Sequence, residues 1–522
     1  MTSYETIDYT PLLALATDEV VTHSYVRDVK LGSGKTVALI TLDNGKDHTR
    51  PNTLGPRSLL ELNDVLDSIA QRVKQGEVDA VAITGKQFIL AAGADLSKVR
   101  EITSVDLALK MGQLGHRALG KLGTLGAPSF AFVNGLALGG GLEIALNATY
   151  RTVDTSAAAL ALPEVFLGLI PGWGGATILP RLIGLRNAIT VAIENPLKSN
   201  RLLKPADALK FGIVDRAFGP ARFLEESLAW ADRVLTKREK VSRPHSPSSL
   251  ARALTWPTIA RVARKQIESK IGTVAASPYL ALDTMAASAR GSLHEGFVRE
   301  DAALSRLIAG DQFQASMYAF NLVQKHAKAP SGAPDKALAQ KVTKVGVIGA
   351  GLMARQFALL FVRRLRVPVL LTDVDQGRLE QAIQYIHDEL AKDLAKGKIT
   401  QDTLNRLQAL VSGTTDIAEF ADADWIIEAV FEELGVKQDV FARIESVASP
   451  DAIFATNTSS LSVNAIGAKL RRPERLVGFH FFNPVAVMPL IEVVNAPPNQ
   501  RDCTGNGNGN CGKAQEDRHH HL

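Results

Sequence analysis

Short apolar runs alternate with amphipathic stretches along the first half of the chain. Residues 36–42 (TVALITL), 80–84 (AVAIT) and 129–133 (SFAFV) are apolar runs with the length and composition of buried strands. Between the first two runs, residues 57–73 place apolar side chains at helical spacing, and residues 139–148 begin another helix. This alternation predicts an α/β fold.

The pattern changes farther along the chain. Residues 241–255 are rich in Ser, Pro and Arg and are expected to form an exposed loop, whereas residues 278–328 are helical in pattern. Residues 326–344 (HAKAPSGAPDKALAQKVTK) have the composition of a linker. The tail at 497–522 holds almost no large apolar residue, and we expect it to be disordered. It resembles a frameshift product or a cloning scar.

These changes predict four segments. The predicted segments are a first domain with C-terminal linker helices (1–325), a linker (326–344), a second domain (345–496) and a tail that does not look native (497–522).

Composition excludes several classes of protein. Hydrophobic residues make up 46% of the 522 residues and charged residues 22%, which is typical of a globular protein. The net charge of +5 is spread along the chain, so we expect no nucleic-acid partner. No apolar stretch reaches the ~18 residues of a membrane span, and residues 1–20 do not look like a signal peptide. Both cysteines, Cys503 and Cys511, lie in the tail, which suits a reducing cytoplasm.

Three segments of the first half carry candidate chemistry: 90–98 (LAAGADLSK), 134–145 (NGLALGGGLEIA) and 162–175 (LPEVFLGLIPGWGG). A glycine run before a helix lets a ligand approach the backbone, and the first helical amides can face a negative charge. Gly140 is placed to offer one such amide, and the turn at Ala94 offers a second. Two converging amides form an oxyanion hole, worth ~3–4 kcal/mol per donor in a transition state.

Two glutamates, Glu143 and Glu164, follow these amides. Adding water to a conjugated thioester requires one group to activate the water and another to protonate the α-carbon. Two carboxyl groups can do both if their surroundings separate their pKa values. Taken singly, the features have ordinary explanations, because glycine triplets are common in loops and a glutamate at a helix start complements the helix dipole.

The three segments together resemble the crotonase (enoyl-CoA hydratase/isomerase) superfamily over roughly residues 37–214. The resemblance includes residues 203–208 (LKPADA) and 212–215 (GIVD). It implies a ββα superhelix and makes Glu143 and Glu164 the acid/base pair. Many crotonases lack one or both glutamates, so their presence here implies hydratase chemistry.

Further roles follow from the same resemblance. Ala94 and Gly140 would be the oxyanion donors, and Gly172 would hold the reacting water. The backbone carbonyls of Ala92 and Ala94 would face the adenine of coenzyme A. The chain departs from the family at Ser97, which stands where a lysine is thought to meet a CoA phosphate.

A dinucleotide-binding pattern opens the second domain. Residues 345–354 (VGVIGAGLMA) form an apolar strand that runs into Gly349 and Gly351, with Ala354 at the third small position. A helix and a second strand ending at Asp373 follow, which is the context that the pattern requires. Asp373 at this position favours NAD over NADP. The alternative is an accidental glycine turn.

Three later segments resemble the 3-hydroxyacyl-CoA dehydrogenase family: 428–437 (EAVFEELGVK), 454–461 (FATNTSSL) and 478–485 (GFHFFNPV). The resemblance makes His480 the base that removes the hydroxyl proton, and Glu492 the residue that orients it. Histidine suits this role because its ordinary pKa lies near neutrality. A lone histidine in an apolar strand would otherwise be a core residue.

The resemblance also implies roles around the nicotinamide. Ser459 would bond the reacting oxygen, while Glu432, Lys437 and Asn457 would lie on the nicotinamide side of the cofactor. The resemblance ends near residue 496, before the helical domain that in this family covers the acyl-CoA. We therefore expect hydration with little or no dehydrogenation.

The order of the two domains resembles the α-subunit family of the fatty-acid oxidation complex. That family implies reversible hydration of trans-2-enoyl-CoA, NAD-dependent oxidation of 3-hydroxyacyl-CoA, a thiolase β subunit as partner, and an oligomer. It implies no metal. Two alternatives stay open: Δ3–Δ2-enoyl-CoA isomerase or other crotonase chemistry, and a truncated product that binds CoA or NAD without turnover.

Overall fold

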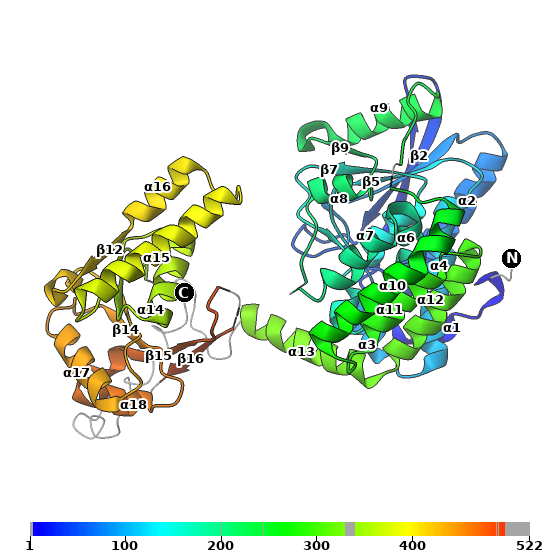
Figure 1. Cartoon of the computed structure of the whole chain (residues 1–522). Helices are drawn as coiled ribbons and strands as arrows, with labels where there is room; N and C mark the ends of the chain where they lie inside the picture. The colour runs from blue at the N-terminus through cyan, green and yellow to red at the C-terminus, as the bar shows by residue number, and fades with distance from the viewer. Residues whose placement is uncertain are drawn as a thin grey trace. The chain divides into compact units, whose positions relative to one another are not determined.

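The computed structural model describes residues 4–328 and 340–495, apart from residues 199, 244, 487 and 489. The chain divides into two compact units, Met1–Gln324 and Lys325–Leu522 (Figure 1). The predicted disordered tail lies outside the described residues, and so does most of the predicted linker at 326–344.

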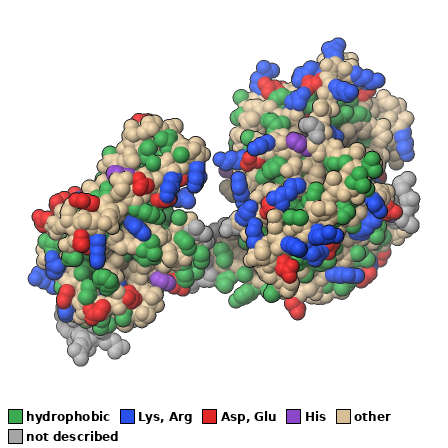
Figure 2. All heavy atoms as spheres, viewed as in Figure 1, with side chains coloured by type: hydrophobic (Ala, Val, Ile, Leu, Met, Phe, Trp, Pro, Cys, Tyr) green, Lys and Arg blue, Asp and Glu red, His purple; other side chains and the backbone are tan. Residues whose placement is uncertain are grey.

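Charged side chains are mixed on the surface. Figure 2 shows Lys and Arg interspersed with Asp and Glu on the visible face of both units. Among the described helices, none is long and apolar enough to cross a bilayer.

The first unit contains a six-stranded sheet in the order β1-β2-β3-β5-β7-β9, parallel except for the β1–β2 hairpin. Its strands are β1 (His23–Lys30), β2 (Thr36–Asp43), β3 (Ala80–Gly85), β5 (Ser129–Val133), β7 (Tyr150–Asp154) and β9 (Arg216–Phe218). Strands β2, β3 and β5 cover the three apolar runs of the sequence, and β3 and β5 are buried at every position. Apolar runs without alternation form these strands because both faces of the sheet are covered.

The first unit also contains a three-stranded sheet with the strand order β4-β6-β8. Its strands are β4 (Phe88–Ala91), β6 (Gly135–Leu138) and β8 (Leu160–Ala161). Each follows a strand of the large sheet, so successive strand pairs and their helices wind as a ββα superhelix. The predicted fold of this unit is therefore confirmed.

Several helices cover the sheets, and one of them carries the candidate residues Gly140 and Glu143. The helices are α2 (Pro56–Lys74), α4 (Val105–Gly120), α5 (Gly140–Asn147) and α6 (Gly175–Ile183), followed by α10 (Ser249–Ile271), α11 (Ser277–Ala287), α12 (Leu293–Ile308) and α13 (Asp311–Lys328). One continuous apolar core joins them to both sheets. The helical pattern predicted for 278–328 is confirmed.

The loop predicted at 241–255 is wrong in its second half, because α10 begins at Ser249. The Ser248 side chain caps the helix by accepting a hydrogen bond from the Ala251 amide. The helix buries Trp256, Ala263 and Ile267 on one face. The Ser- and Pro-rich composition hid this spacing, since the apolar positions lie beyond the segment that looked like a loop.

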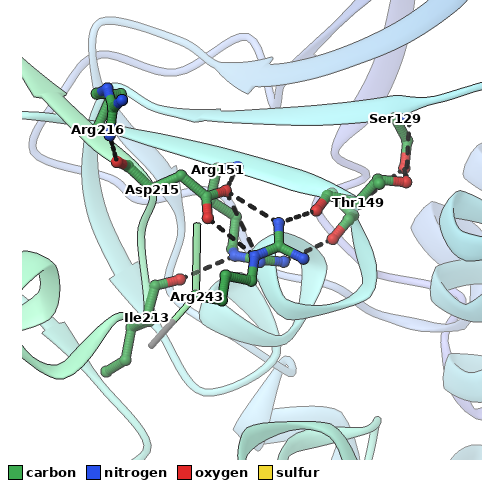
Figure 3. A network of polar contacts seen from close by, with 8 residues as sticks. Ser129, Thr149, Arg151, Ile213, Asp215, Arg216 and Arg243 are labelled. Atoms are coloured by element: carbon green, nitrogen blue, oxygen red, sulfur yellow. Dashed lines mark hydrogen bonds and ion pairs between the residues drawn. The ribbon is translucent and has the colours of Figure 1, made fainter. Parts of the chain in front are cut away.

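The motif at 212–215 ties the end of the sheet together (Figure 3). Asp215 accepts a hydrogen bond from the Arg151 amide at 2.8 Å and from Arg243 Nε at 3.0 Å. The Arg151 guanidinium donates to the carbonyl of Ile213 at 2.8 Å. Burial lowers the pKa of Arg151 to about 10, while Asp215 opposes that change. Asp215 therefore compensates a buried cation and acts in the fold.

The second unit is a doubly wound sheet with the strand order β12-β11-β10-β13-β14-β15-β16. The strands are β10 (Val345–Ile348), β11 (Val369–Thr372), β12 (Val411–Thr414), β13 (Trp425–Glu428), β14 (Ile453–Thr456), β15 (Leu476–Phe481) and β16 (Ile491–Asn495). All neighbouring pairs are parallel except β15–β16. The order reverses between β10 and β13, where such sheets bind ligands beyond the carboxyl ends of the strands. The predicted Rossmann fold is confirmed.

Helices lie on the faces of this sheet, and α14 (Leu352–Arg364) follows β10 directly. The others are α15 (Gln376–Ala395), α16 (Gln401–Ala409), α17 (Leu434–Glu445) and α18 (Val463–Ile466). Two apolar clusters, one with Val347 and Phe357 and one with Ile426 and Phe454, form the core of the unit.

Candidate active site

The start of α5 forms one wall of a cavity of about 280 Å³ in the first unit. Gly140 is the first residue of α5, and a Cβ atom there would lie 2.5 Å from the Trp173 ring. A Cβ on Gly93 would lie 3.2 Å from the Gly140 amide nitrogen, so the 93–94 turn lies against the start of the helix. Ala94 and Gly140, the two predicted oxyanion donors, both line this cavity.

Glu143 lies one turn into α5 and is 2% exposed. Its Oε1 accepts hydrogen bonds from the amides of Trp173 at 2.7 Å and Gly175 at 2.8 Å. Burial, and after it the nearby charge of Glu300, raise the pKa of Glu143 to about 7, although the amides of Trp173 and Gly175 oppose the rise. At neutral pH this carboxyl group can therefore exchange a proton.

Glu164 is the first residue of the 3-10 helix η3 (Glu164–Leu167) and faces the same cavity. Burial raises its pKa well above the ordinary value, and the charge of Glu143 adds to the rise. Its Oε2 is buried and makes no hydrogen bond to the described residues. Because the charge of Glu143 disfavours ionisation of Glu164, the pair favours a state with one ionised and one protonated carboxyl group.

Apart from Asn200 and the two glutamates, the described side chains that line the cavity are mainly apolar. Gly172 belongs to its wall, and a Cβ atom there would lie 2.5 Å from Leu304 Cδ2. The apolar lining comes from five parts of the unit: Leu96, Val99, Met111, Phe166, Leu167, Leu169, Ile170, Leu304, Ile308 and Phe320. Ala92 and Ala94 lie at the same wall. Such a lining suits an apolar chain beside a reacting polar group.

A larger cavity, of about 620 Å³, lies at the strand-order reversal of the second unit. Gly349, Gly351 and Asp373 line it together with residues after β13. Gly349 has φ +105°, and a Cβ there would meet the Ala429 carbonyl at 2.7 Å. Asp373 ends β11 and accepts the Ala350 amide at 2.9 Å, which fixes its carboxylate beside the glycine turn.

This cavity fits a dinucleotide. A Cβ on Gly351 would meet no described atom within 4 Å, so the backbone at the start of α14 is open to the cavity. A pyrophosphate can approach such a helix start. Ala354 is fully buried behind the turn, where only a small residue lets helix and strand meet.

His480 and Glu492 stand opposite each other on the antiparallel strands β15 and β16. His480 Nδ1 lies 2.8 Å from Glu492 Oε2. This pairing explains the twelve-residue spacing (492 − 480), because the hairpin brings the two positions face to face. The carboxylate can orient the ring and leave Nε2 for another partner.

The three residues predicted on the nicotinamide side, and Ser459, which was predicted to bond the reacting oxygen, have partners of their own. Lys437 is buried, with Nζ 2.6 Å from Glu428 Oε1 and 3.1 Å from Glu432 Oε2. Glu432 also accepts the Ser459 amide at 3.1 Å, and Asn457 Oδ1 accepts the Phe481 amide at 2.9 Å. The structure joins these residues in a network that links β13, β14 and β15, and they are not among the residues that line the large cavity.

Comparison with known proteins gives a family match for each unit. Residues 32–271 match the enoyl-CoA hydratase/isomerase family, and residues 344–506 match the 3-hydroxyacyl-CoA dehydrogenase NAD binding domain. The chain is a fusion of these two families. We call its parts the hydratase domain and the dehydrogenase domain.

Two relatives that match most of this chain are longer than it is. The peroxisomal fatty acid beta-oxidation multifunctional protein of Oryza sativa subsp. japonica is 30% identical over 463 residues, which cover 88% of this chain and 61% of the relative. The fatty acid oxidation complex subunit alpha of Shewanella amazonensis is 31% identical over 464 residues, covering 88% and 64%. This chain therefore spans less than two thirds of either relative. The crystal structure of 3-hydroxybutyryl-CoA dehydrogenase from Escherichia coli K12 is 41% identical over 30% of this chain and 32% of its own, with a TM-score of 0.29.

Sequence reasoning missed a buried cluster beside the hydratase cavity. His116 of α4 lies between Glu300 and Asp301 of α12, and Glu300 Oε2 accepts the Gly174 amide at 2.7 Å. The only signal in the sequence was an adjacent pair of acidic residues, which in a helix usually faces solvent. Glu300 and Asp301 lie 184 and 185 residues from His116 along the chain, which gave no reason to connect them.

Lys98, which follows the position where Ser97 differs from the family pattern, forms ion pairs within the hydratase domain. Lys98 Nζ pairs with Asp18 Oδ1 at 2.5 Å and with Glu101 Oε1 at 2.8 Å. Ser97 itself bonds Asp95 Oδ1 through both its amide and its hydroxyl. The Lys98–Asp18 pair joins α3 (Leu96–Glu101) to the N-terminal segment, and the other contacts lie within α3 and its N-cap.

Proposed function

We propose that the hydratase domain catalyses the reversible hydration of trans-2-enoyl-CoA to 3-hydroxyacyl-CoA. The observation that carries this proposal is the shared cavity, in which two carboxyl groups with raised pKa values face two predicted oxyanion amides. Family membership of residues 32–271 supports the reaction class.

In this reaction the thioester oxygen accepts the amides of Ala94 and Gly140. The ionised member of the Glu143–Glu164 pair takes a proton from water as the water oxygen bonds to C3. The electrons of the double bond move toward the thioester, and the protonated member delivers its proton to C2. Preorganised amides supply most when the charge on the oxygen is greatest.

Loss of the ultraviolet absorbance of the enoyl thioester, on mixing the protein with crotonyl-CoA, tests the proposal. Hydration converts the conjugated thioester into a 3-hydroxy thioester, so the absorbance falls. Binding of CoA without a fall in absorbance would favour a non-catalytic product instead. A Δ3-enoyl-CoA substrate that gains this absorbance would show isomerase chemistry, for which a single base is sufficient.

We propose a second activity for the dehydrogenase domain: NAD-dependent oxidation of the 3-hydroxyacyl-CoA. The His480–Glu492 contact favours it, because oxidation of an alcohol requires a base. Gly349, Gly351 and Asp373 would hold the cofactor, which accepts a hydride when bound. His480 would remove the hydroxyl proton through Nε2, with Ser459 bonding the same oxygen.

We expect this oxidation to be slow relative to hydration in the chain as printed. Among the described residues, the side chain of His480 is 21% exposed and that of Glu492, which orients it, is 52% exposed, so this pair is not enclosed. Positioning of the substrate supplies up to ~7–11 kcal/mol of a barrier, and an open surface supplies little of it. NADH absorbance with 3-hydroxybutyryl-CoA and NAD measures the rate. An oxidation rate as high as the hydration rate would show that the exposed His480–Glu492 pair supports full catalysis.

The place of the protein in metabolism is proposed from its relatives. We infer a role in fatty-acid β-oxidation, with a thiolase β subunit as partner, an oligomeric assembly and a cytoplasmic location. The names of the Shewanella and rice relatives support the pathway, while the rice protein is named as peroxisomal. Co-purification of the full chain with a thiolase subunit from the same genome, compared with a variant lacking residues 325–522, tests the partner.

A further inference from the structure

A buried charged cluster joins helices α4 and α12 of the hydratase domain. His116 Nδ1 lies 2.8 Å from Asp301 Oδ1, and His116 Nε2 lies 3.0 Å from Glu300 Oε2. The side chains of His116 and Glu300 are fully buried, and the Asp301 side chain nearly so. Tyr4 donates to Asp301 Oδ2 at 3.1 Å, and the Phe297 ring stacks on His116 with centroids 4.4 Å apart.

The backbone turn at residues 173–175 connects this cluster with Glu143. Glu300 Oε2 accepts the Gly174 amide, while Glu143 Oε1 accepts the amides of Trp173 and Gly175 on either side of it. Three successive amides are thus shared between two carboxylates from different helices. Any shift of Glu300 would move the turn that fixes Glu143.

The cluster beside this turn contains two carboxyl groups, Glu300 and Asp301, and one histidine, His116. Burial by itself would lower the pKa of His116, but Asp301 and Glu300 outweigh burial and raise it to about 10, so the ring is a cation at neutral pH. The charge of Glu300 raises the pKa of both Glu143 and Glu164, whereas His116 lowers that of Glu143. Among the described residues, Tyr4 and Tyr9 of the N-terminal segment also lie near Asp301, and His294 of α12 packs against the Tyr4 ring.

The segment that supplies the carboxylates lies outside the family match. Residues 32–271 match the enoyl-CoA hydratase/isomerase family, and α12 spans Leu293–Ile308. The catalytic glutamates therefore depend on a helix that follows the matched region.

We infer that Glu300, held by His116, which Asp301 holds in turn, is a positioning residue that fixes the 173–175 turn and sets the electrostatic environment of the Glu143–Glu164 pair. This inference rests on the proposed hydration. It assigns α12 a part in the reaction in addition to its part in the core.

The test compares pH profiles of kcat/KM for hydration of crotonyl-CoA. In Glu300→Gln the amide oxygen can still accept both the Gly174 amide and His116 Nε2, so the change removes charge and keeps the contacts. Losing a negative charge beside two carboxyl groups lowers both of their pKa values. The whole profile should move to lower pH, by on the order of one pH unit.

Asp301→Asn is the matched control. It removes the same charge from the same cluster, but Asp301 does not contact the 173–175 turn through any described hydrogen bond. Its profile should move by less than half as much. Glu300→Ala removes charge and contact together, so it should move the profile in the same direction and also lower kcat at the new optimum.

The outcomes separate the two proposals. Absence of hydration in the unaltered protein would overturn the proposed function, and the inference with it. Hydration with a profile that stays in place in a folded Glu300 variant would overturn the inference alone. Failure of both Glu300 variants to fold, with Asp301→Asn folded, would make Glu300 a structural residue and also overturn it.

Discussion

At the scale of single residues, the two carboxyl groups of the hydratase cavity differ in what holds them. Glu143 is fixed by two backbone amides, and Glu164 has an oxygen without a described partner. If they share one hydration reaction, Glu143→Gln and Glu164→Gln should each lower kcat by at least ~10²-fold, a typical loss when acid/base help is removed. Stopped-flow assays with crotonyl-CoA measure the loss. Near-normal turnover in either folded variant would contradict a mechanism with two carboxylates.

Burial of Glu143 should also appear as pH-dependent stability. Its pKa is raised from 4.5 to about 7, so its contribution to stability is present at low pH and is lost as pH rises through 7. Glu143→Gln has no such loss, and its Oε1 can still accept both amides. The unfolding free energy of the variant relative to the unaltered chain should therefore rise by about 2–3 kcal/mol between pH 5 and pH 8. Urea unfolding followed by tryptophan fluorescence measures this; an equal difference at both pH values would contradict it.

Asp215 supports the fold without entering the cavity. Removing one partner of a buried ion pair leaves a charge uncompensated, so Asp215→Asn should lower the unfolding free energy by about 3–5 kcal/mol. Arg216→Gln is the control, because Arg216 pairs with Glu239 at a partly exposed position and should cost less than about 1 kcal/mol. Both values come from urea unfolding. Similar losses of unfolding free energy in the two variants would contradict the explanation based on the buried charge of Arg151.

At the scale of elements, the sequence predicted the parts whose cause is local. Continuous apolar runs gave β2, β3 and β5, and the glycine pattern gave the start of α14. The start of α10 was missed because a Ser- and Pro-rich composition outweighed the spacing of a few buried residues. The twelve-residue step from His480 to Glu492 was visible in the sequence, since a hairpin makes it a local contact.

Contacts between distant elements could not be predicted in the same way. The His116 cluster depends on how α4 and α12 meet, and no periodicity along the chain encodes that meeting. The sequence therefore named candidate reacting groups, while the groups that position them required coordinates.

Gly140, the first residue of α5, allows a test of whether its backbone amide acts in the reaction. A Cβ at Gly140 meets Trp173, so Gly140→Ala and Gly140→Pro share the same intrusion, but only Pro removes the amide donor. Proline is tolerated at the first position of a helix, so α5 should still form. We expect Pro to lower kcat by ~10²–10³-fold more than Ala does, with similar affinity of both for butyryl-CoA.

Steady-state hydration and calorimetric binding measure the two effects. Equal kcat values in Gly140→Ala and Gly140→Pro would assign Gly140 to packing and remove its amide from the oxyanion hole. Equal losses of kcat and of affinity in the proline variant would lead to the same conclusion, because an oxyanion donor matters most in the transition state.

At the scale of the whole molecule, two units with separate cores each contain one ligand site. The hydratase cavity is lined by residues of Met1–Gln324, and the dinucleotide cavity by residues of Lys325–Leu522. A ligand that binds only the folded state stabilises the unit it contacts, by about 2.7 kcal/mol at a hundred times its dissociation constant. Each ligand should therefore stabilise its own unit. The two units can then be assigned to two unfolding transitions.

We expect calorimetry of the full chain to show two transitions with different ligand responses. NAD should raise the midpoint of one transition by roughly 5–10 °C, and butyryl-CoA, which has no double bond to hydrate, should raise the other. Asp373→Ala removes the carboxylate beside the glycine turn, so it should abolish the NAD response and leave the butyryl-CoA response intact. A single transition that responds to both ligands would show that the units unfold together. An NAD response that survives in Asp373→Ala would move the cofactor away from the cavity at the strand reversal.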